Sequence, residues 1–282
     1  MSPFRNKVAI VTGGGAGIGE ALCQEMARQG AKVVVADISQ ENAQTVAASI
    51  AEKGGSARGV MVDVSKEADV RHLVDETTSI EGRLDYMFNN AGIAIGGDVR
   101  DLSMDQWRRV IDVDMFGVLY GTLAAYRVMV EQGFGHIVNT SSATGLSPQP
   151  GNAPYCVSKH AVVGLSLSLR FEGADLGVKV SVVCPGYVRT NIYRNMELAN
   201  ISRERFAAQL SRRKEMEASQ AAKVILDGVE HNRSIIVFPA WVRWAWRLYR
   251  FSPGLLDRAW LNGIREFRKY RLGEQTPTPE TV

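Results

Sequence analysis

Short aliphatic and β-branched runs recur along this chain, and segments long enough for a helix separate them. Several runs are apolar on both faces, which is typical of parallel strands that helices cover on both sides. The alternation predicts an α/β fold with a doubly wound, mostly parallel, seven-stranded sheet and helices on both of its faces. The seven predicted strands begin at Lys7, Lys32, Ala57, Leu84, His136, Val178 and Ser234.

A glycine-rich turn connects the first predicted strand to a helix-like run. It contains Gly13, Gly17 and Gly19, and Ile18 separates the last two. Glycine lets the backbone approach a pyrophosphate closely, and the N-terminus of a helix attracts the negative charge. A glycine cluster can also be a plain flexible turn, but the strand before it and the helix after it favour a dinucleotide site in a Rossmann-like fold.

An acidic residue stands at the end of the second predicted strand. Asp37 comes eighteen residues after Gly19, where a carboxylate can accept hydrogen bonds from the adenosine ribose and repel a 2′-phosphate. Neither the glycine turn nor Ile38, the neighbouring residue in the predicted cofactor site, supplies a basic group to hold such a phosphate. NAD is therefore the predicted cofactor rather than NADP. The alternative is that Asp37 is an ordinary solvated loop acid.

A tyrosine and a lysine lie four residues apart in another helix-like segment. Tyr155 and Lys159 follow Pro154, which suits the first turn of a helix, so both side chains share one face. A nearby ammonium group lowers the pKa of a phenol and makes it a better base at neutral pH. Such pairs are also common on helix surfaces, so this spacing alone does not establish catalysis.

Taken together, these segments resemble the short-chain dehydrogenase/reductase family. The resemblance covers about residues 5–240, in the family's order. It rests on the glycine turn TGGGAGIG, on NNAG, on YCVSK with a serine thirteen residues before its tyrosine, and on CPGYVRT. The activity that it implies is hydride transfer between a secondary alcohol or ketone and a nicotinamide ring.

The resemblance also implies a role for each matching residue. Ser142 would hold the substrate oxygen, Tyr155 would exchange its proton, and Lys159 would lower the pKa of the tyrosine and bind the nicotinamide ribose. The other cofactor contacts that it implies are Asp63 and Val64 at the adenine, Asn90, Ala91 and Gly92 along the cofactor, Pro185 and Gly186 in the next segment, and Val188 and Thr190 at the carboxamide.

One position departs from the family's pattern. Asp114 stands where the family has an asparagine, the fourth member of its catalytic set, which helps to hold a water molecule of the proton relay. An aspartate can accept hydrogen bonds from that water, but its charge favours charged Lys159 and opposes a tyrosinate. Three interpretations stay open: a working variant, a slowed enzyme, and a NAD-binding regulatory or scaffolding protein with little turnover.

The segments expected beside the nicotinamide carry mainly apolar and aromatic side chains, among them Ile95, Tyr187 and Tyr193. Few charged groups are present there to bind a carboxylate or a phosphate. The predicted substrate is therefore a hydrophobic secondary alcohol or its ketone, with Ser142 and Tyr155 at the reacting oxygen. The alternative is that these apolar residues only pack within the protein.

Residues 241–272 are predicted to form a helical extension to a catalytic domain of residues 1–240, and residues 273–282 a disordered tail. Within 241–271, eight basic residues stand against two acidic ones, a net charge of +6, and four of the five tryptophans lie here. Arg243, Arg247 and Arg250 share one helical face. An amphipathic helix of this kind suits peripheral contact with a membrane, but it also suits packing over the substrate pocket or a subunit contact.

Composition narrows the remaining possibilities. The formal charge of +3 is too balanced to predict nucleic acid as a partner. Three cysteines without a CxxC spacing predict neither a disulfide framework nor a metal site, so we expect a reducing, cytoplasmic environment. No secretory signal is evident, and the apolar run 115–126 is predicted to be a buried helix rather than a membrane span. A homo-oligomer, dimer or tetramer, follows from the resemblance.

Overall fold

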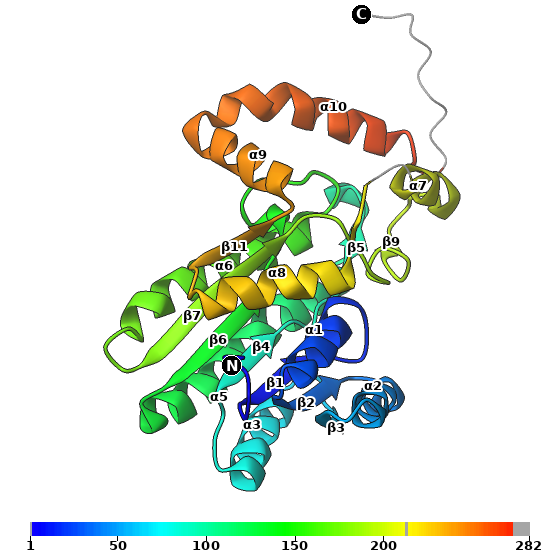
Figure 1. Cartoon of the computed structure of the whole chain (residues 1–282). Helices are drawn as coiled ribbons and strands as arrows, with labels where there is room; N and C mark the ends of the chain where they lie inside the picture. The colour runs from blue at the N-terminus through cyan, green and yellow to red at the C-terminus, as the bar shows by residue number, and fades with distance from the viewer. Residues whose placement is uncertain (1, 212–213, 273–282) are drawn as a thin grey trace, which may run out of the picture.

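Seven parallel strands form the central sheet of this protein (Figure 1). The computed structural model describes residues 2–211 and 214–272. The predicted seven-stranded, doubly wound sheet is confirmed, and each strand runs parallel to its neighbours. In spatial order the strands are β11 (Ile235–Phe238), β7 (Val178–Pro185), β6 (Gly135–Thr140), β4 (Tyr86–Asn89), β1 (Val8–Thr12), β2 (Lys32–Asp37) and β3 (Ser56–Met61).

The strand order reverses between β1 and β4. The chain runs outward from β1 to β3, returns to the other side of β1 as β4, and then runs outward again to β11. In a sheet of this kind a crevice opens beyond the carboxyl ends of the strands at the point of reversal. The glycine turn follows β1 and Asn90 follows β4, so the topology brings two predicted cofactor segments to this point.

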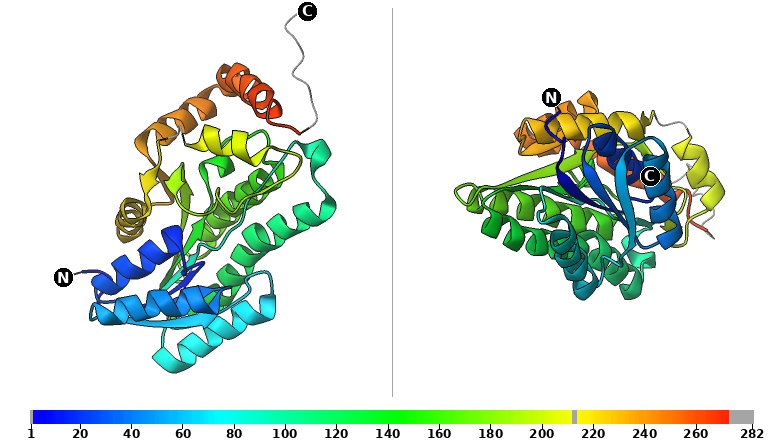
Figure 2. Two further views of the ribbon diagram at one scale, coloured as in Figure 1. Left: turned by 90° about the vertical axis from the view of Figure 1, so that its right-hand side faces the viewer. Right: turned by 60° about the horizontal axis from the view of Figure 1, so that its bottom comes forward.

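Helices cover both faces of the sheet (Figures 1 and 2). Because apolar side chains from both layers pack on it, every residue of β1 is buried. The helices of the first face are α1 (Gly17–Arg28), α2 (Gln40–Glu52) and α8 (Ala218–Glu230). Those of the second face are α3 (Glu67–Glu81), α5 (Gly117–Gln132) and α6 (Ala153–Glu172).

One long helical segment, Met104–Gln132, joins α4 (Met104–Ile111), a π-helical turn (Asp112–Phe116) and α5. Among the residues that the structure describes, it is the one helix long and apolar enough to cross a membrane, judged by length and composition alone. Its α5 part packs on the sheet through buried Val118, Ala125 and Met129. The apolar run 115–126 therefore lies in a core helix.

A small lobe, residues 94–102 and 191–211, stands beyond the carboxyl edge of the sheet. Short elements that the sequence did not predict hold its two halves together, since β5 pairs in parallel with β9. The elements of the small lobe are β5 (Ile95–Gly96), a 3-10 turn (Val99–Asp101), β9 (Glu197–Leu198) and α7 (Arg203–Leu210). Next to it, β8 (Val188–Arg189) pairs with β10 (Met216–Glu217), and a second 3-10 turn (Ala143–Gly145) follows β6.

The C-terminal extension crosses the top of the molecule in Figure 1. Helix α9 (Ala240–Phe251) starts directly after β11, a 3-10 turn (Pro253–Leu256) follows, and α10 (Asp257–Arg268) runs back toward the small lobe. The predicted helical extension is therefore present, beginning at Ala240. The predicted tail 273–282 lies outside the described residues.

Candidate active site

A cleft opens at the carboxyl edge of the sheet, where the strand order reverses. The ends of β1, β2, β4, β6 and β7, the start of α6 and the small lobe supply its walls. Most of the predicted site residues line it, namely Gly13, Gly17, Ile18, Asp37, Ile38, Asp63, Val64, Asn90, Ala91, Gly92, Ile95, Ser142, Tyr155, Lys159, Pro185, Gly186, Val188, Thr190 and Tyr193.

Three predicted residues lie one layer behind the cleft surface. Gly19 sits in the first turn of α1, where an added Cβ would lie 2.0 Å from the Gly13 carbonyl oxygen. Asp114 is fully buried beside Lys159. Tyr187 packs on Tyr193 with its ring centroid 5.8 Å away. These residues therefore shape the cleft through their neighbours.

The glycine turn forms a cradle that side chains would fill. Gly13 and Gly17 adopt left-handed conformations, with φ of +62° and +58°, which favour glycine. Asp37 braces the turn, because its Oδ2 accepts a hydrogen bond from the Gly15 N–H at 2.9 Å and its Oδ1 accepts one from the Ser39 N–H at 3.0 Å. A cradle of this shape at the start of α1 fits the pyrophosphate of a dinucleotide.

Thr12 fastens the glycine turn to the segment after β4. Its hydroxyl oxygen accepts hydrogen bonds from the N–H groups of Asn90 at 3.0 Å and Ala91 at 3.2 Å. The Asn90 side-chain amide donates to the Thr12 carbonyl at 3.1 Å. Two segments that are far apart in the sequence thereby form one continuous wall of the cleft.

Ser142, Tyr155 and Lys159 meet at the small-lobe end of the cleft. Ser142 lies just beyond β6 and caps the following 3-10 turn, its Oγ accepting from the Thr144 N–H at 3.2 Å. Tyr155 and Lys159 occupy the first two turns of α6. The Lys159 ammonium donates to the Thr140 carbonyl at 3.2 Å and lies 5.2 Å from the centroid of the Tyr155 ring.

Asp114 and Lys159 form a buried ion pair. Asp114 Oδ2 is 3.1 Å from Lys159 Nζ, and the two side chains are 0% and 2% exposed. The π-helical turn carries Asp114 inward, and its Oδ1 accepts from the Ile93 N–H at 2.8 Å. Burial raises the pKa of Asp114, while Lys159 and the Ile93 N–H oppose this shift. The pair fixes the ammonium group beside the tyrosine.

The surroundings of Tyr155 favour its neutral form. Burial and then the charge of Asp114 raise the pKa of the phenol, and a hydrogen bond with Ser142 acts in the opposite direction. A neutral phenol beside a serine hydroxyl can donate a proton to a carbonyl oxygen. The reverse reaction requires the phenolate, which this arrangement makes harder to form.

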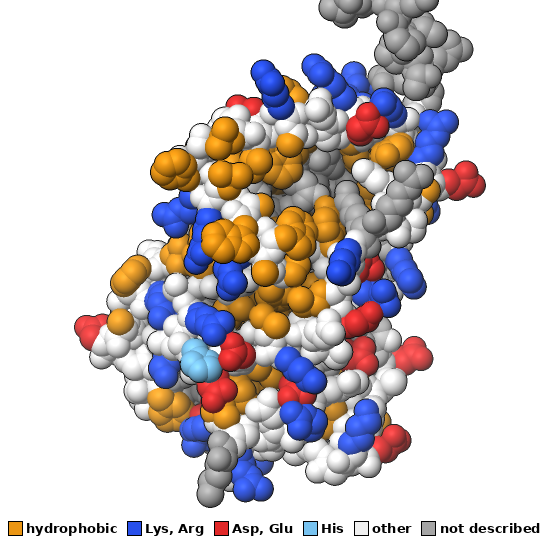
Figure 3. All heavy atoms as spheres, turned by 45° about the horizontal axis from the view of Figure 1, so that its top comes forward, with side chains coloured by type: hydrophobic (Ala, Val, Ile, Leu, Met, Phe, Trp, Pro, Cys, Tyr) orange, Lys and Arg blue, Asp and Glu red, His pale blue; other side chains and the backbone are white. Residues whose placement is uncertain are grey.

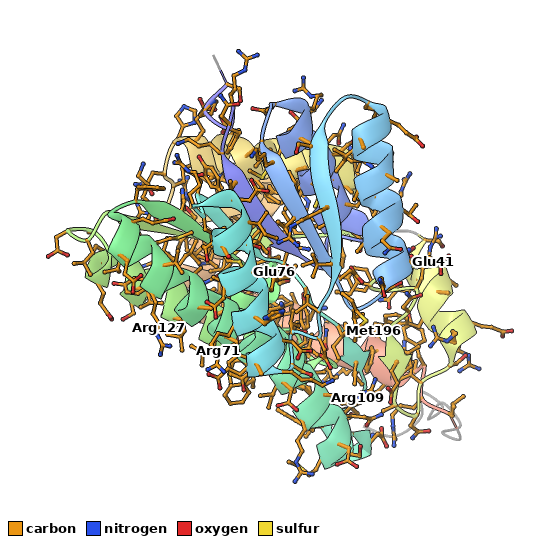
Figure 4. All side chains as sticks on the ribbon, turned by 90° about the horizontal axis from the view of Figure 1, so that it is seen from below. Glu41, Arg71, Glu76, Arg109, Arg127 and Met196 are labelled. Atoms are coloured by element: carbon orange, nitrogen blue, oxygen red, sulfur yellow. The ribbon has the colours of Figure 1, made fainter. Side chains whose placement is uncertain are left out.

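Several lining residues escaped the sequence analysis, among them Arg109, Asn191, Ile192, Asn195 and Glu197. Arg109 of α4 pairs with Glu197 at 2.7 Å across the mouth of the cleft, on the side where Figure 4 labels Arg109 and Met196. No local pattern could indicate this contact, because 88 residues separate the partners. This pairing affects which substrates can bind, because the Glu197 carboxylate already neutralises the charge of Arg109.

Within residues 2–211 and 214–272, no group of three or more His, Cys, Asp or Glu side chains is placed to hold a metal ion. The three cysteines are free thiols, and Cys23 and Cys184 are buried.

Comparison with known proteins decides the family. The model of the short chain dehydrogenase family matches residues 7–200. The chain belongs to this family. The resemblance seen in the sequence motifs is therefore confirmed, and the protein is an oxidoreductase of the short-chain dehydrogenase/reductase class that acts on CH–OH groups.

Individual relatives agree with this assignment. Meso-2,3-butanediol dehydrogenase of Serratia marcescens is 39% identical over 189 residues, 67% of this chain and 74% of that protein. Cyclohexanol dehydrogenase of Acinetobacter sp. strain SE19 is 38% identical over 201 residues, covering 70% and 79%. A short-chain dehydrogenase/reductase from Burkholderia phymatum, solved in complex with NAD, superposes with a TM-score of 0.83 at 31% identity and covers 90% of this chain and 96% of that one.

Proposed function

We propose that the protein interconverts a hydrophobic secondary alcohol and its ketone, using NAD and with Tyr155 as the acid and base. The observation that carries this proposal is a single cleft that joins a glycine cradle and Asp37 at one end to Ser142, Tyr155 and Lys159 at the other. A nicotinamide cofactor bound along such a cleft supplies the hydride acceptor or donor.

The choice of NAD over NADP rests on Asp37. Its carboxylate lines the cleft at the end of β2, where it would repel a 2′-phosphate. The next residue, Ile38, is 71% exposed and offers no cation for that phosphate. The NAD held by the Burkholderia phymatum relative supports the same choice.

The geometry supports a division of labour among the catalytic residues. In oxidation, Ser142 donates a hydrogen bond to the substrate oxygen and Tyr155 takes the hydroxyl proton. Lys159 stabilises the phenolate by its charge, and Asp114 keeps the ammonium group in place. In reduction, neutral Tyr155 would donate its proton to the oxygen of the ketone.

The walls near Tyr155 favour an apolar substrate. Ala94, Ile95, Ile192 and Tyr193 line this part of the cleft, and Arg109 is engaged by Glu197. The surface therefore offers apolar contact and no unpaired cation from Arg109 for a carboxylate. The names of the relatives, a 2,3-butanediol dehydrogenase and a cyclohexanol dehydrogenase, support a secondary alcohol, and cyclohexanol is a largely apolar one.

The test is NADH formation, followed by absorbance, from cyclohexanol and other hydrophobic secondary alcohols, with NADP in parallel. We expect NAD-linked turnover in the wild type and a loss of about a hundredfold or more in Tyr155→Phe, because general acid–base catalysis contributes about 10²–10⁴-fold. NAD should bind both proteins alike. Equal rates of NADH formation by wild type and Tyr155→Phe would contradict the proposal. Binding of NAD without turnover of any alcohol on the panel would favour the regulatory alternative.

We further propose that the protein is a cytoplasmic homo-oligomer whose helix α9 contacts anionic membrane surfaces. Trp241, Trp244 and Phe251 of α9 are 54%, 63% and 90% exposed, and Arg243 and Arg247 lie on the same helix. Figure 3 shows apolar side chains gathered over this end of the molecule with Lys and Arg around them. Exposed tryptophans next to arginines suit a lipid interface. The cytoplasmic location rests on a separate observation, since three free thiols fit a reducing compartment.

Co-sedimentation with vesicles tests the membrane contact. Full-length protein should pellet with vesicles that contain about one third anionic lipid, and less with neutral vesicles, because arginines are attracted to the anionic surface. Trp244→Glu should abolish the binding. If wild type and Trp244→Glu pellet equally, the membrane proposal is wrong, and the dehydrogenase proposal is unaffected.

A further inference from the structure

We propose that residues 266–272 form a clamp that positions the small lobe for substrate, with Arg268 and Arg271 as its positioning residues. This inference rests on the proposed function, since the small lobe carries the wall of the cleft on the side of Tyr155. It assigns the end of the C-terminal extension to substrate binding, whereas α9 at the start of the extension presents Trp241 and Trp244 to solvent.

Two arginines of the clamp hold the first half of the small lobe. Arg271 binds Asp101 through two hydrogen bonds, Nε to Oδ2 at 2.8 Å and Nη2 to Oδ1 at 2.9 Å, and the side chains are only 11% and 13% exposed. Arg268 Nε lies 2.6 Å from Oδ2 of Asp98, which is 9% exposed. Planar, paired contacts of this kind fix orientation as well as distance. Both acids follow directly after β5.

The backbone of the clamp holds the second half of the small lobe. The Tyr270 carbonyl accepts from the Ser202 N–H at 2.7 Å, and the Leu272 N–H donates to the Asn200 carbonyl at 3.0 Å. Ile201 and Arg271 form an antiparallel bridge between these two bonds. The last residues of the clamp therefore pair with the segment that follows β9 through one isolated bridge, and a single stretch of chain contacts both halves of the lobe.

Two aromatic side chains of the clamp pack in the same apolar cluster as Tyr155. Phe267 and Tyr270 pack in the apolar cluster around buried Ala94 and Met196, and the same cluster includes Tyr155. A shift of the clamp would therefore reach the tyrosine and the apolar wall through the cluster that they share. The glycine cradle and Asp37 belong to a different part of the cleft, so the clamp should leave cofactor binding unchanged.

Arg271→Ala tests the clamp, with Arg265→Ala, at an exposed position of α10 just before the clamp, as the matched control. With cyclohexanol and saturating NAD, we expect Arg271→Ala to raise KM about tenfold and to change kcat less than threefold, because the lost contact costs about 1.4 kcal/mol of substrate positioning. The Kd for NAD should stay within about twofold. Arg265→Ala should have the same KM, kcat and Kd for NAD as the wild type.

A second readout separates the clamp from the proposed function. Amide hydrogen exchange of residues 196–202 in the NAD-bound protein needs no turnover, and it should speed up in Arg271→Ala but not in Arg265→Ala. The double variant Arg271→Asp with Asp101→Arg should restore both slow exchange and low KM. If Arg271→Ala leaves the exchange of 196–202 unchanged, the clamp is wrong even if the enzyme works. If the exchange rises while no protein oxidises cyclohexanol, the clamp stands and the substrate proposal fails.

Discussion

Asp114 places a carboxylate 3.1 Å from the ammonium group of Lys159, in surroundings closed to solvent. Such a pair requires desolvation of both charges, and removal of one partner leaves the other buried and uncompensated. The same carboxylate raises the pKa of Tyr155, after the larger effect of burial. The phenolate needed for alcohol oxidation therefore forms at a higher pH than it would beside a neutral residue.

Asp114→Asn should move the pH profile of alcohol oxidation toward lower pH. Removing the negative charge lowers the pKa of Tyr155, so the rise of kcat/KM with pH should shift down by about one pH unit. Asp112→Asn, at an exposed position of the same π-helical turn, serves as the control and should not shift the profile. A shift to higher pH in Asp114→Asn would contradict the role assigned to the pair.

His136 should make the stability of the folded protein depend on pH, independently of the catalytic residues. Its side chain is buried, and burial, with smaller effects of Lys179 and Arg170, lowers its pKa from 6.5 to about 3. The Ser181 hydroxyl donates its hydrogen to the Arg233 carbonyl, so His136 Nε2 must donate to Ser181 Oγ at 2.8 Å. The ring is therefore neutral in the folded protein at neutral pH.

Because the unfolded chain takes up a proton at His136 near pH 6.5 and the folded chain does not, stability should fall as the pH drops. The loss attributable to this residue is about 2 kcal/mol between pH 7.5 and 5. Urea unfolding at several pH values measures it. His136→Gln, which keeps a donor for Ser181, should show a flatter dependence over that range, and an unchanged slope would refute this assignment.

At the scale of elements, the start of α1 lies so close to the glycine turn that Gly19 leaves no room for a side chain. A Cβ on Gly19 would meet the Gly13 carbonyl oxygen at 2.0 Å and the Asn90 side chain at 2.7 Å. Gly19→Ala should therefore displace the cradle and weaken NAD binding at least about tenfold, as titration calorimetry would measure. Gly164→Ala, in α6 with open space around it, is the matched control and should bind NAD normally. Normal binding by Gly19→Ala would show that the cradle tolerates a shift.

The elements also show how far local patterns reach. The seven main strands were predictable because most of them are short, largely apolar runs between helix-like segments. The motifs of the cradle and of α6 led to most of the cleft lining. The pairing of β5 with β9 was not predictable from the sequence, because each strand has only two residues and its partner lies about a hundred positions away. The Arg109–Glu197 pair and the contacts of Arg268 and Arg271 with the small lobe were not predictable for the same reason.

At the scale of the whole molecule, the two ends of the C-terminal extension face different environments. Arg271 is held against the small lobe, whereas Trp244 and Phe251 of α9 lie in solvent. The views of Figure 2 show the extension as an outlying layer beside the α/β body. The sequence could reveal its amphipathic character but not which part packs, because that depends on contacts with distant segments.

If the exposed stripe of α9 serves a membrane rather than a subunit contact, the mass of the assembly should not depend on it. Light scattering should give the same dimer or tetramer for wild type and Trp244→Glu, because a charge on an exposed face disturbs no subunit contact there. Phe267→Ala, inside the apolar cluster, offers a comparison that should alter substrate binding and not mass. A lower mass for Trp244→Glu would instead make α9 part of the subunit interface.

The bonds from Arg268 and Arg271 to Asp98 and Asp101 each span 170 residues. During synthesis on the ribosome, β1 to β4 and the glycine turn emerge and can fold long before these arginines leave the exit tunnel. If the proposed clamp holds, translation that stops short of α10 would release a protein that keeps its cofactor cradle but binds the alcohol more weakly. The last part of the chain to be made would then complete the substrate half of a cleft whose cofactor half is already folded.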